Sequence, residues 1–411
     1  MAQQRGTMVM DTLQQRISKM RLGAASAGLT LAFVLGLGMV ASESVQAQTF
    51  TVLYSFGGNE RKNEEHPYAH LARDSEGNLY GTTSGGGRSY GAFGTVFKVS
   101  ETGKETVLHS FTGSPDDGQT PYAGVVRDKE GNLYGTTLYG GVFGSGTVFK
   151  VNRVGEETVL HSFVAPDGYD PFGGLLLDKK NNLYGTTAYG GISGCGTVFK
   201  LNPSSALTVL HSFAGGSSDG CEPVFTSLIM DAKHNLYGIT YFGGTYGSGA
   251  VYKLTKTGAL TVLHSFAGYP SDGCKVYGSP AIDKKGNLYG TASGCGSNDL
   301  GIVWKVSQQG TETVLHNFAG YPSDGANPYA GVLIDAKGNL YGTTYSGGSS
   351  DYGTVYELSK KGKLTLLHSF AESDGIGPIK GLLRDAKGNF YGTAVGGGSH
   401  EFYGSVWKLT P

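Results

Sequence analysis

The sequence has little charge and no clear helical periodicity. Only 16% of its 411 residues are Asp, Glu, Lys or Arg, against about 25% in a typical globular protein. The formal net charge of −1 gives no basic footprint for nucleic acid, so we expect no nucleic-acid partner. After residue 47 no stretch sustains the apolar period of a capped helix. Glycine is abundant instead, at 69 positions, which is typical of an all-β fold with many tight turns.

The first 47 residues have the pattern of a secretory signal peptide. A basic stretch ending at Arg21 precedes an apolar run from Leu22 to Ala41, and Val45-Gln46-Ala47 is a small-x-small cleavage pattern. The run is long enough to span a bilayer if it stays uncleaved, but the cleavage pattern favours its removal. We therefore expect residues 1–47 to be a signal peptide, with no membrane span after cleavage. Losing its four basic and two acidic residues brings the net charge to −3.

The tetrapeptide Leu-Tyr-Gly-Thr recurs about every 52 residues. It begins at Leu79, Leu133, Leu183, Leu288 and Leu340, with variants at Leu236 and Phe390. Each unit holds four short, alternating apolar runs separated by Gly, Asn and Asp turn signals. Repeats of this length with four strands each predict the blades of a β-propeller.

The two ends of the repeat region complement one another. The segment from Thr51 to Phe56 is an orphan copy of the outermost strand, whereas the last unit has only three strands and ends with Gly404 to Leu409. Pairing of these segments would complete a seventh blade and remove the open sheet edges. We therefore predict an all-β, seven-bladed β-propeller over residues 48–411. Each blade has four strands, the N-terminal strand closes the last blade, and the protein is expected to be a monomer.

The repeat unit resembles the GloVer (Gloeo/Verruco) tandem repeat. The resemblance rests on Thr-Val-Leu-His-Ser-Phe, Asp-Gly, Pro-Tyr-Ala-Gly-Val, Asp-x-x-Gly-Asn-Leu-Tyr-Gly-Thr-Thr and Gly-Thr-Val-Phe-Lys, and it runs from Thr49 to Pro411. It implies an exported bacterial propeller, secreted or periplasmic, and brings no established activity, cofactor or catalytic residue. The first unit departs from the pattern with Tyr54 in place of His and a charged insertion from Asn59 to His66. Through Asp-x-x-Gly-Asn-Leu-Tyr the unit also resembles, more weakly, bacterial propellers that bind ligands or hydrolyse lactones.

Residues that recur from unit to unit are interpreted as structural, because a catalytic base needs one specific environment. The outer strands repeat a histidine at His109, His161, His211, His264, His316 and His368. The Asp of each Asp-x-x-Gly-Asn turn caps that turn. A second aspartate series precedes glycine at Asp117, Asp167, Asp219, Asp272, Asp324 and Asp374. One carboxylate per blade does not supply the six to eight converging oxygens of a Ca²⁺ site, so turn residues are the favoured interpretation and we expect no metal and no cofactor.

Aromatic residues begin the innermost strand in six of the seven units. They are Tyr68, Tyr122, Phe172, Phe225, Tyr277 and Tyr329. Packing between blades is one interpretation. The other is an aromatic collar at the channel mouth that stacks on a sugar or another flat ligand.

All four cysteines fall in the third to fifth units. An exported protein meets an oxidising compartment, where an even number of cysteines indicates disulfides. Local pairing, Cys195–Cys221 and Cys274–Cys295, is geometrically simplest. A four-cysteine zinc site is the alternative, but the Cys-x-x-Cys spacing usual for such sites is absent.

A specific site should lie where the units differ. At two inner-strand positions that otherwise hold small residues, the first unit has His70 and the last has Lys380. These two units are neighbours across the closure, where unrepeated His66, His400 and Glu401 also lie. We predict that His70, Lys380, His66, His400 and Glu401 form a ligand-binding recess at the channel mouth.

Two classes of function remain. The first is a non-enzymatic scaffold that binds a glycan, peptide or protein on its loop-rich face. The second is a metal-dependent, lactonase-like hydrolase with its site in the central channel. That chemistry needs carboxylate or Asn ligands from several inner strands. Those strands offer Ala, Gly, Leu and Val, with His70 alone as a plausible ligand, so the sequence favours binding and assigns no catalytic residue.

Overall fold

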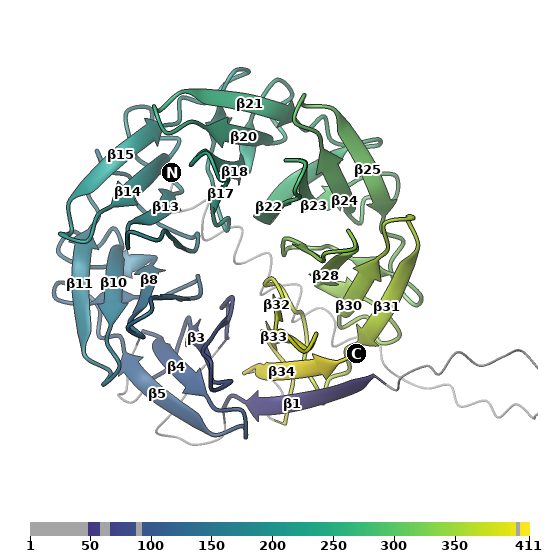
Figure 1. Cartoon of the computed structure of the whole chain (residues 1–411), viewed down its shortest axis with the longest axis horizontal. Helices are drawn as coiled ribbons and strands as arrows, with labels where there is room; N and C mark the ends of the chain where they lie inside the picture. The colour runs from purple at the N-terminus through teal and green to yellow at the C-terminus, as the bar shows by residue number, and fades with distance from the viewer. Residues whose placement is uncertain (1–47, 58–65, 88–92, 400–402) are drawn as a thin grey trace, which may run out of the picture. The chain divides into compact units, whose positions relative to one another are not determined.

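The computed structural model describes residues 48–57, 66–87, 93–399 and 403–411. In the unit Gln48–Pro411, seven four-stranded antiparallel sheets are arranged around a common centre (Figure 1). The predicted seven-bladed, all-β propeller is confirmed. No helix among these described residues is long and apolar enough to cross a membrane.

In the first six blades the strands follow sequence order from the centre to the rim. Blades 1 to 3 are β2 (Ala72–Arg73), β3 (Leu79–Thr83), β4 (Thr95–Val99), β5 (Glu105–Ser110); β7 (Val126–Arg127), β8 (Leu133–Thr137), β10 (Thr147–Val151), β11 (Glu157–Ser162); β12 (Leu176–Leu177), β13 (Leu183–Thr187), β14 (Thr197–Leu201), β15 (Leu207–Ser212). Blades 4 to 6 are β17 (Ile229–Met230), β18 (Leu236–Thr240), β20 (Ala250–Leu254), β21 (Leu260–Ser265); β22 (Gly273–Ile282), β23 (Leu288–Cys295), β24 (Ile302–Val306), β25 (Glu312–Asn317); β27 (Leu333–Ile334), β28 (Leu340–Thr344), β30 (Thr354–Leu358), β31 (Leu364–Ser369).

Blade 7 combines the two ends of the chain. Its strands are β32 (Leu383–Arg384), β33 (Phe390–Ala394), β34 (Ser405–Thr410) and β1 (Thr49–Ser55). Strand β1 lies antiparallel to β34, with Thr49 opposite Thr410 and Ser55 opposite Ser405. Figure 1 shows the first and last colours of the chain side by side in this blade. The predicted closure is confirmed.

The glycine of Leu-Tyr-Gly-Thr makes room for an aromatic side chain on the next strand. At Gly135, an added Cβ would lie 2.5 Å from Cζ of Phe149, which is fully buried. The same close approach occurs in every blade, with Phe, Tyr or Trp as the partner. The motif therefore records a packing requirement of each sheet.

The tyrosine of the motif is held by the turn that precedes it. In blade 1 the Asp74 carboxylate accepts hydrogen bonds from the Asn78 backbone N–H at 2.9 Å and its side-chain amide at 2.8 Å. The Tyr80 hydroxyl donates to the same carboxylate at 2.9 Å. The other six blades repeat both the Asn and the Tyr contact. The predicted turn-capping role of this Asp series is confirmed.

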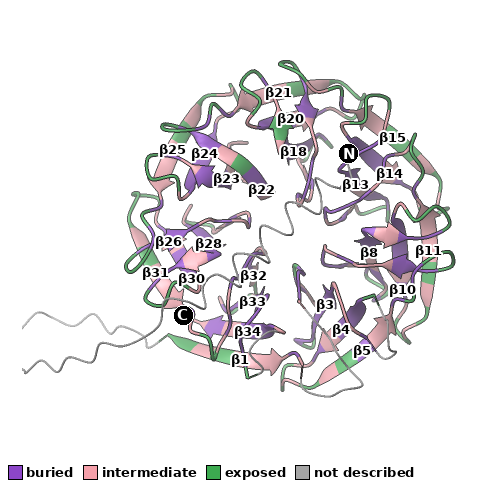
Figure 2. Ribbon diagram, turned by 180° about the vertical axis from the view of Figure 1, so that it is seen from behind, coloured by how far each residue is buried: buried purple, intermediate pink, exposed green. Residues whose placement is uncertain are grey.

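The hydrophobic core lies between neighbouring blades. One cluster joins Val148 and Phe163 of blade 2 to Leu175 and Phe199 of blade 3. Figure 2 shows buried residues concentrated in the middle strands and exposed residues along the outer strands and loops. Buried threonine hydroxyls add polar links, as where Thr82 of blade 1 donates to the Ala123 carbonyl of blade 2 at 2.8 Å.

The outer-strand histidines pair with the aspartates that precede glycine. In six blades the His Nε2 lies 2.9–3.2 Å from an Asp carboxylate oxygen. Asp117, for example, also accepts hydrogen bonds from the backbone N–H groups of Thr112 and Gly118. Each pair therefore fixes the connection that leaves its blade, which agrees with a structural role for both series.

The long connections gather on one face of the propeller. They are the connections from the second to the third strand of each blade and from the fourth strand to the next blade, and we call this side the loop-rich face. Short antiparallel pairings join the two kinds of connection: β6 (Gly118–Gln119) with β9 (Tyr139–Gly140), β16 (Gly220–Cys221) with β19 (Phe242–Gly243), and β26 (Gly325–Ala326) with β29 (Ser346–Gly347).

Both predicted disulfides are present on this face. Cys195 and Cys221 have Cα atoms 4.6 Å apart, and Cys274 and Cys295 have Cα atoms 5.4 Å apart. The first bond joins the second-to-third-strand connection of blade 3 to the segment that leaves that blade. The second joins the adjacent ends of β22 and β23.

Candidate functional site

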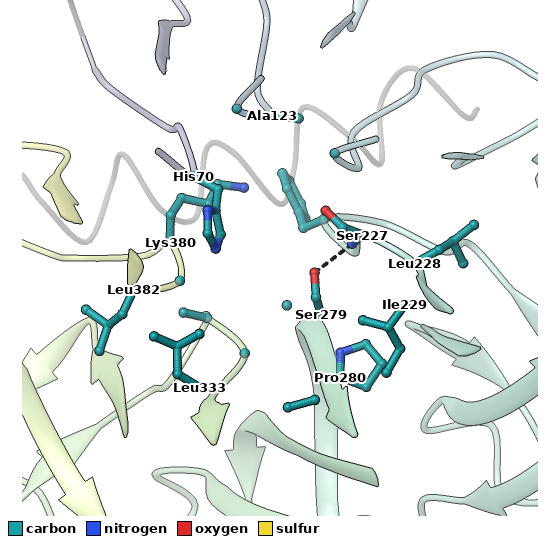
Figure 3. A pocket seen from close by; sticks show the side chains of 18 of the residues that line it. His70, Ala123, Ser227, Leu228, Ile229, Ser279, Pro280, Leu333, Lys380 and Leu382 are labelled. Carbon is teal, nitrogen blue, oxygen red and sulfur yellow. Dashed lines mark hydrogen bonds between the residues drawn. The ribbon is translucent and has the colours of Figure 1, made fainter. Parts of the chain in front are cut away.

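A pocket of about 450 Å³ lies at the centre of the propeller (Figure 3). All seven blades contribute to it, mainly with Gly, Ala, Val, Leu and Ile from the innermost strands. Among the described residues that line it, only His70 and Lys380 are titratable, and Ser227 and Ser279 supply the hydroxyl groups. The volume is within the range of small-molecule sites.

His70 lies against the backbone of blade 7. Its Nδ1 is 3.3 Å from the Leu71 carbonyl oxygen, so an Nδ1–H that donates there leaves Nε2 as an acceptor. An added Cβ at Gly381 would lie 3.1 Å from the imidazole, so glycine at that position leaves space for the ring. Burial lowers the pKa of His70 below its usual value, the Leu71 hydrogen bond opposes this, and the Lys380 charge lowers it further. The ring is therefore neutral at neutral pH.

Lys380 extends from blade 7 across the channel. Its Nζ lies 5.1 Å from the ring centroid of Phe225 in blade 4, a cation–π contact. Burial lowers the pKa of Lys380 to about 8. The side chain is surrounded by protein yet still accessible to solvent in the channel, as is His70. Every ion pair among the described residues joins His to Asp, so Lys380 has no carboxylate partner there.

The six inner-strand aromatic residues form a continuous cluster. Successive ring centroids from Tyr68 to Tyr329 are 4.8–5.9 Å apart. Tyr122 of blade 2 also contacts Phe225 of blade 4, at 6.5 Å. These rings therefore pack mainly against one another, which supports the packing interpretation over an open collar.

A second set of positions lies immediately before this cluster, where each connection enters an innermost strand. We call them the junction positions: His66, Thr120, Asp170, Glu222, Lys275, Asn327 and Gly377. All seven have positive φ values, from 54° at Asn327 to 64° at Gly377. Six of them precede proline, a context that disfavours this conformation. Strained backbone of this kind persists only where its surroundings impose it.

Backbone hydrogen bonds hold the junction positions in place. The Thr120 N–H donates to the Phe93 carbonyl at 2.7 Å, and the Thr120 carbonyl accepts from the Leu138 N–H at 3.1 Å. Equivalent pairs of bonds occur at His66, Asp170, Glu222, Asn327 and Gly377. These six blades thus share the same backbone bonds at the junction, Lys275 of blade 5 lies instead within β22, and no two junction positions hold the same residue. Burial raises the pKa of Asp170 to about 7.

Exposed apolar side chains also gather on the loop-rich face. Among the described residues, nine of the eleven large, exposed hydrophobic side chains lie in its connections: Phe93, Val142, Phe143, Val164, Ile192, Phe242, Tyr246, Tyr269 and Tyr321. The exceptions are Val154, in a turn on the opposite face, and Val209, in an outer strand. Such a concentration is typical of an interaction surface.

The structure brings together two of the five predicted ligand-binding residues. His70 and Lys380 share the central pocket, and Figure 3 shows them side by side. His66 does not line that pocket. It occupies a junction position, with Nδ1 3.1 Å from the Val395 carbonyl oxygen. His400 and Glu401 lie outside the described residues.

Two His-Asp-Glu groups have their ligand atoms within 4.8 Å of one another, close enough to hold a metal ion. They are His109, Asp117, Glu157 and His264, Asp272, Glu312. In both groups the histidine and aspartate form the same pair that occurs in four blades without the glutamate. The pairs therefore have a structural explanation that requires no metal.

Comparison with known proteins gives a family and a fold. The model of the Gloeobacter/Verrucomicrobia repeat matches residues 23–241 and 225–411. An extracellular domain described as part of a hybrid two-component system from B. thetaiotaomicron matches with a TM-score of 0.56 and 16% identity, over 88% of this chain and 41% of that one. An extracellular domain of a one-component system from the same organism matches with a TM-score of 0.55 and 12% identity, over 87% of this chain and 39% of that one.

The chain thus spans about two-fifths of these two structures, and at such identities the similarity shows the fold alone. A gluconolactonase from Xanthomonas campestris matches with a TM-score of 0.42 and 14% identity, over 68% of this chain and 82% of that one. That similarity is too low to bear on activity. No curated protein matches the chain.

Proposed function

Because this chain belongs to the Gloeobacter/Verrucomicrobia repeat family and closes its repeats into a propeller, we propose that it is an exported, non-enzymatic binding scaffold. Its ligand is a glycan, peptide or protein that docks on the loop-rich face. The observation that supports this most directly is the set of junction positions. Seven positions with similar positive φ, six of them held by the same pair of backbone hydrogen bonds, carry six different side chains and one glycine around one axis.

This arrangement is suited to recognition. Side chains on a rigid backbone lose less conformational freedom on binding than side chains on a mobile loop. The exposed apolar residues of the same face supply contact area, and Tyr246, Tyr269 and Tyr321 can each stack on a ligand and offer a hydroxyl group. The ligand would thus meet polar side chains near the axis and aromatic ones in the surrounding loops.

An exported location agrees with the two disulfides, since such bonds persist in oxidising compartments. The signal peptide over residues 1–47 remains part of this proposal. We place the mature protein in the bacterial periplasm or outside the cell.

The lactonase-like alternative is poorly supported by the central pocket. A hydrolytic metal site needs several carboxylate, Asn or His ligands from the inner strands. The residues that line the described pocket include no Asp, Glu or Asn, and His70 is its only residue of a usual ligand type.

The proposal is tested by glycan and peptide arrays probed with the purified mature protein. We expect Tyr269→Ser/Tyr321→Ser to reduce binding to the recognised ligand at least tenfold. The matched control is Val154→Ser, which removes an exposed apolar side chain on the opposite face and should leave binding unchanged. Equal binding by the double variant and the wild type would refute docking at these loops.

A further inference from the structure

The central pocket contains a cation without a counter-ion. Lys380 enters it with a primary amine, and no acidic residue lines the described pocket. Its ammonium group lies over the face of the Phe225 ring, 5.1 Å from the centroid. Removing an ammonium group from bulk water is costly unless an opposite charge compensates for it, and a ligand anion would supply that charge.

The polar groups near Lys380 suit an oxygen anion. The Nε2 of His70 lies on the Gly381 side of the channel, next to the residue that follows Lys380. Once protonated, this imidazole is a second donor, and a bound anion favours its protonation. Figure 3 shows the side chains of Ser227 and Ser279 across the same space, where the Ser279 hydroxyl accepts from the Ser227 N–H at 2.9 Å.

The rest of the lining is apolar. Leu228, Ile229 and Leu333 are among the aliphatic residues that line the pocket, and Phe172 adds an aromatic ring. A strongly hydrated anion such as sulfate would lose its water shell there without compensation. A ligand with an apolar body would bury that body against these side chains.

We propose that the central pocket binds a small organic carboxylate, with the carboxylate at Lys380 beside His70 and an apolar body against the aliphatic lining. Neither a junction position nor an exposed apolar residue of the loop-rich face lines this pocket, so the site does not depend on the docking proposed above. It also accounts for the two unrepeated residues of the channel. His70 and Lys380 replace small residues in blades that the closure makes neighbours, and together they place an imidazole and a positively charged amine on one side of the pocket.

The test uses three probes with the same six-carbon chain: hexanoate, hexan-1-ol and hexylamine. Their affinities for the mature protein are measured by isothermal titration calorimetry at pH 7. We expect hexanoate to bind at least tenfold more tightly than either other probe. Lys380→Met, which keeps the bulk but removes the charge, should reduce hexanoate binding to the level of hexanol.

Lys253→Met is the matched control. Lys253 contacts the Tyr237 ring at 5.9 Å outside the central pocket, so its loss removes the same charge from the same kind of contact and should leave hexanoate binding intact. Lys380→Ala is a second variant that should fold normally, because alanine is the residue at the equivalent positions Ala69, Ala123 and Ala330. It should bind hexanoate as weakly as Lys380→Met while keeping the wild-type melting temperature.

A pH series adds a second readout. Hexanoate affinity should fall as the pH rises through about 8, where Lys380 loses its proton, and the fall should be absent in Lys380→Met. Equal affinities for hexanoate and hexanol, unchanged hexanoate binding in Lys380→Met, or no binding of any probe would each overturn the proposal. Array binding at the loop-rich face is measured separately in Lys380→Met, so a failure here is distinct from a failure of the docking proposal.

Discussion

At the scale of single residues, the repeat is best understood as a set of packing requirements. Leucine, or Phe390 in blade 7, fills the space between blades, tyrosine bonds to the turn aspartate, and glycine accommodates an aromatic ring from the adjacent strand. Each of these roles recurs in every blade. Where a side chain makes the same contact in every blade, the same residue type recurs. At the junction positions the hydrogen bonds that recur involve only the backbone, so the residue type varies.

The glycine requirement predicts a large effect from one methyl group. In Gly135→Ala the new Cβ would lie 2.5 Å from the Phe149 ring, so the ring or the strand must shift. We expect a loss of about 1–3 kcal/mol in the free energy of unfolding, measured by urea denaturation. Combining it with Phe149→Leu should cost less than the sum of the two single changes. Additive losses would show that the ring is not what excludes the methyl group.

At the scale of strands, the first residue of the outer strand differs between blades, and in blades 2 and 5 this residue contacts the rim of the preceding blade. The first residue of the outer strand is Leu in β15, β21 and β31 but glutamate in β5, β11 and β25. Two of these glutamates, Glu157 of β11 and Glu312 of β25, each lie beside a His–Asp pair of the preceding blade. One carboxylate oxygen of each, Oε1, is buried without a hydrogen-bond partner among the described residues. Burial, followed by the charge of Asp117, raises the pKa of Glu157 from 4.5 to about 7, while His109 opposes the shift.

This shift predicts a pH-dependent stability. Between about pH 4.5 and 7 the folded state binds a proton at Glu157 that the unfolded state releases, so the free energy of unfolding falls as the pH rises. Because the side chain is half-exposed, we expect only about 1 kcal/mol from this residue. Urea denaturation at pH 5 and pH 8 should show that Glu157→Leu removes this loss. The control Glu156→Leu, at an exposed turn, should lose stability between pH 5 and pH 8 as the wild type does. An unchanged pH dependence in Glu157→Leu would contradict this account.

The disulfide at the ends of β22 and β23 gives a second prediction for the strands. Cys274 and Cys295 are 21 residues apart, and a cross-link of that span stabilises a protein by about 3 kcal/mol through the unfolded chain. Cys274→Ala/Cys295→Ala should therefore have a lower urea midpoint than the wild type under non-reducing conditions. Reductant should affect the double variant less than the wild type. Identical midpoints for the two proteins would show that the bond adds no stability.

Much of this architecture is predictable from the sequence because it depends on local pattern and spacing. The alternation of apolar and polar residues predicts the strands, and the repeat of about 52 residues predicts the blades. The orphan first strand and the incomplete last unit predict the closure. The pairing of His109 with Asp117 was missed, since each belongs to its own repeated series and only the folded connection brings them together. The positive φ at the junction positions was also unforeseen, because residues before proline usually adopt extended conformations.

The central pocket was only partly predictable, for a physical reason of the same kind. His70 and Lys380 stood out because they replace small residues. The contact of Lys380 with Phe225 depends on the width of the channel, and the fit of His70 depends on Gly381. Distances across the channel depend on the tilt of the blades and the diameter of the closed propeller, and no single repeat determines either.

At the scale of the whole molecule, repetition and variation have different places. Repeated residues form the blades, the interfaces between them and the His–Asp pairs of the rim. Unrepeated residues concentrate around the axis, at the junction positions and in the central pocket. We therefore expect changes of the unrepeated residues to alter binding without altering the fold, and changes of the repeated ones to do the reverse.

The most direct test replaces the junction side chains together. Asparagine already occupies the junction position of blade 6 as Asn327 with a φ of 54°, and it tolerates this backbone conformation better than most residues. The variant His66→Asn/Thr120→Asn/Asp170→Asn/Glu222→Asn/Lys275→Asn should keep the wild-type melting temperature to within a few degrees. In the same array experiment it should lose at least tenfold in affinity for the recognised ligand. Unchanged binding by this folded variant would contradict the central claim that the junction positions of the loop-rich face determine what the protein binds.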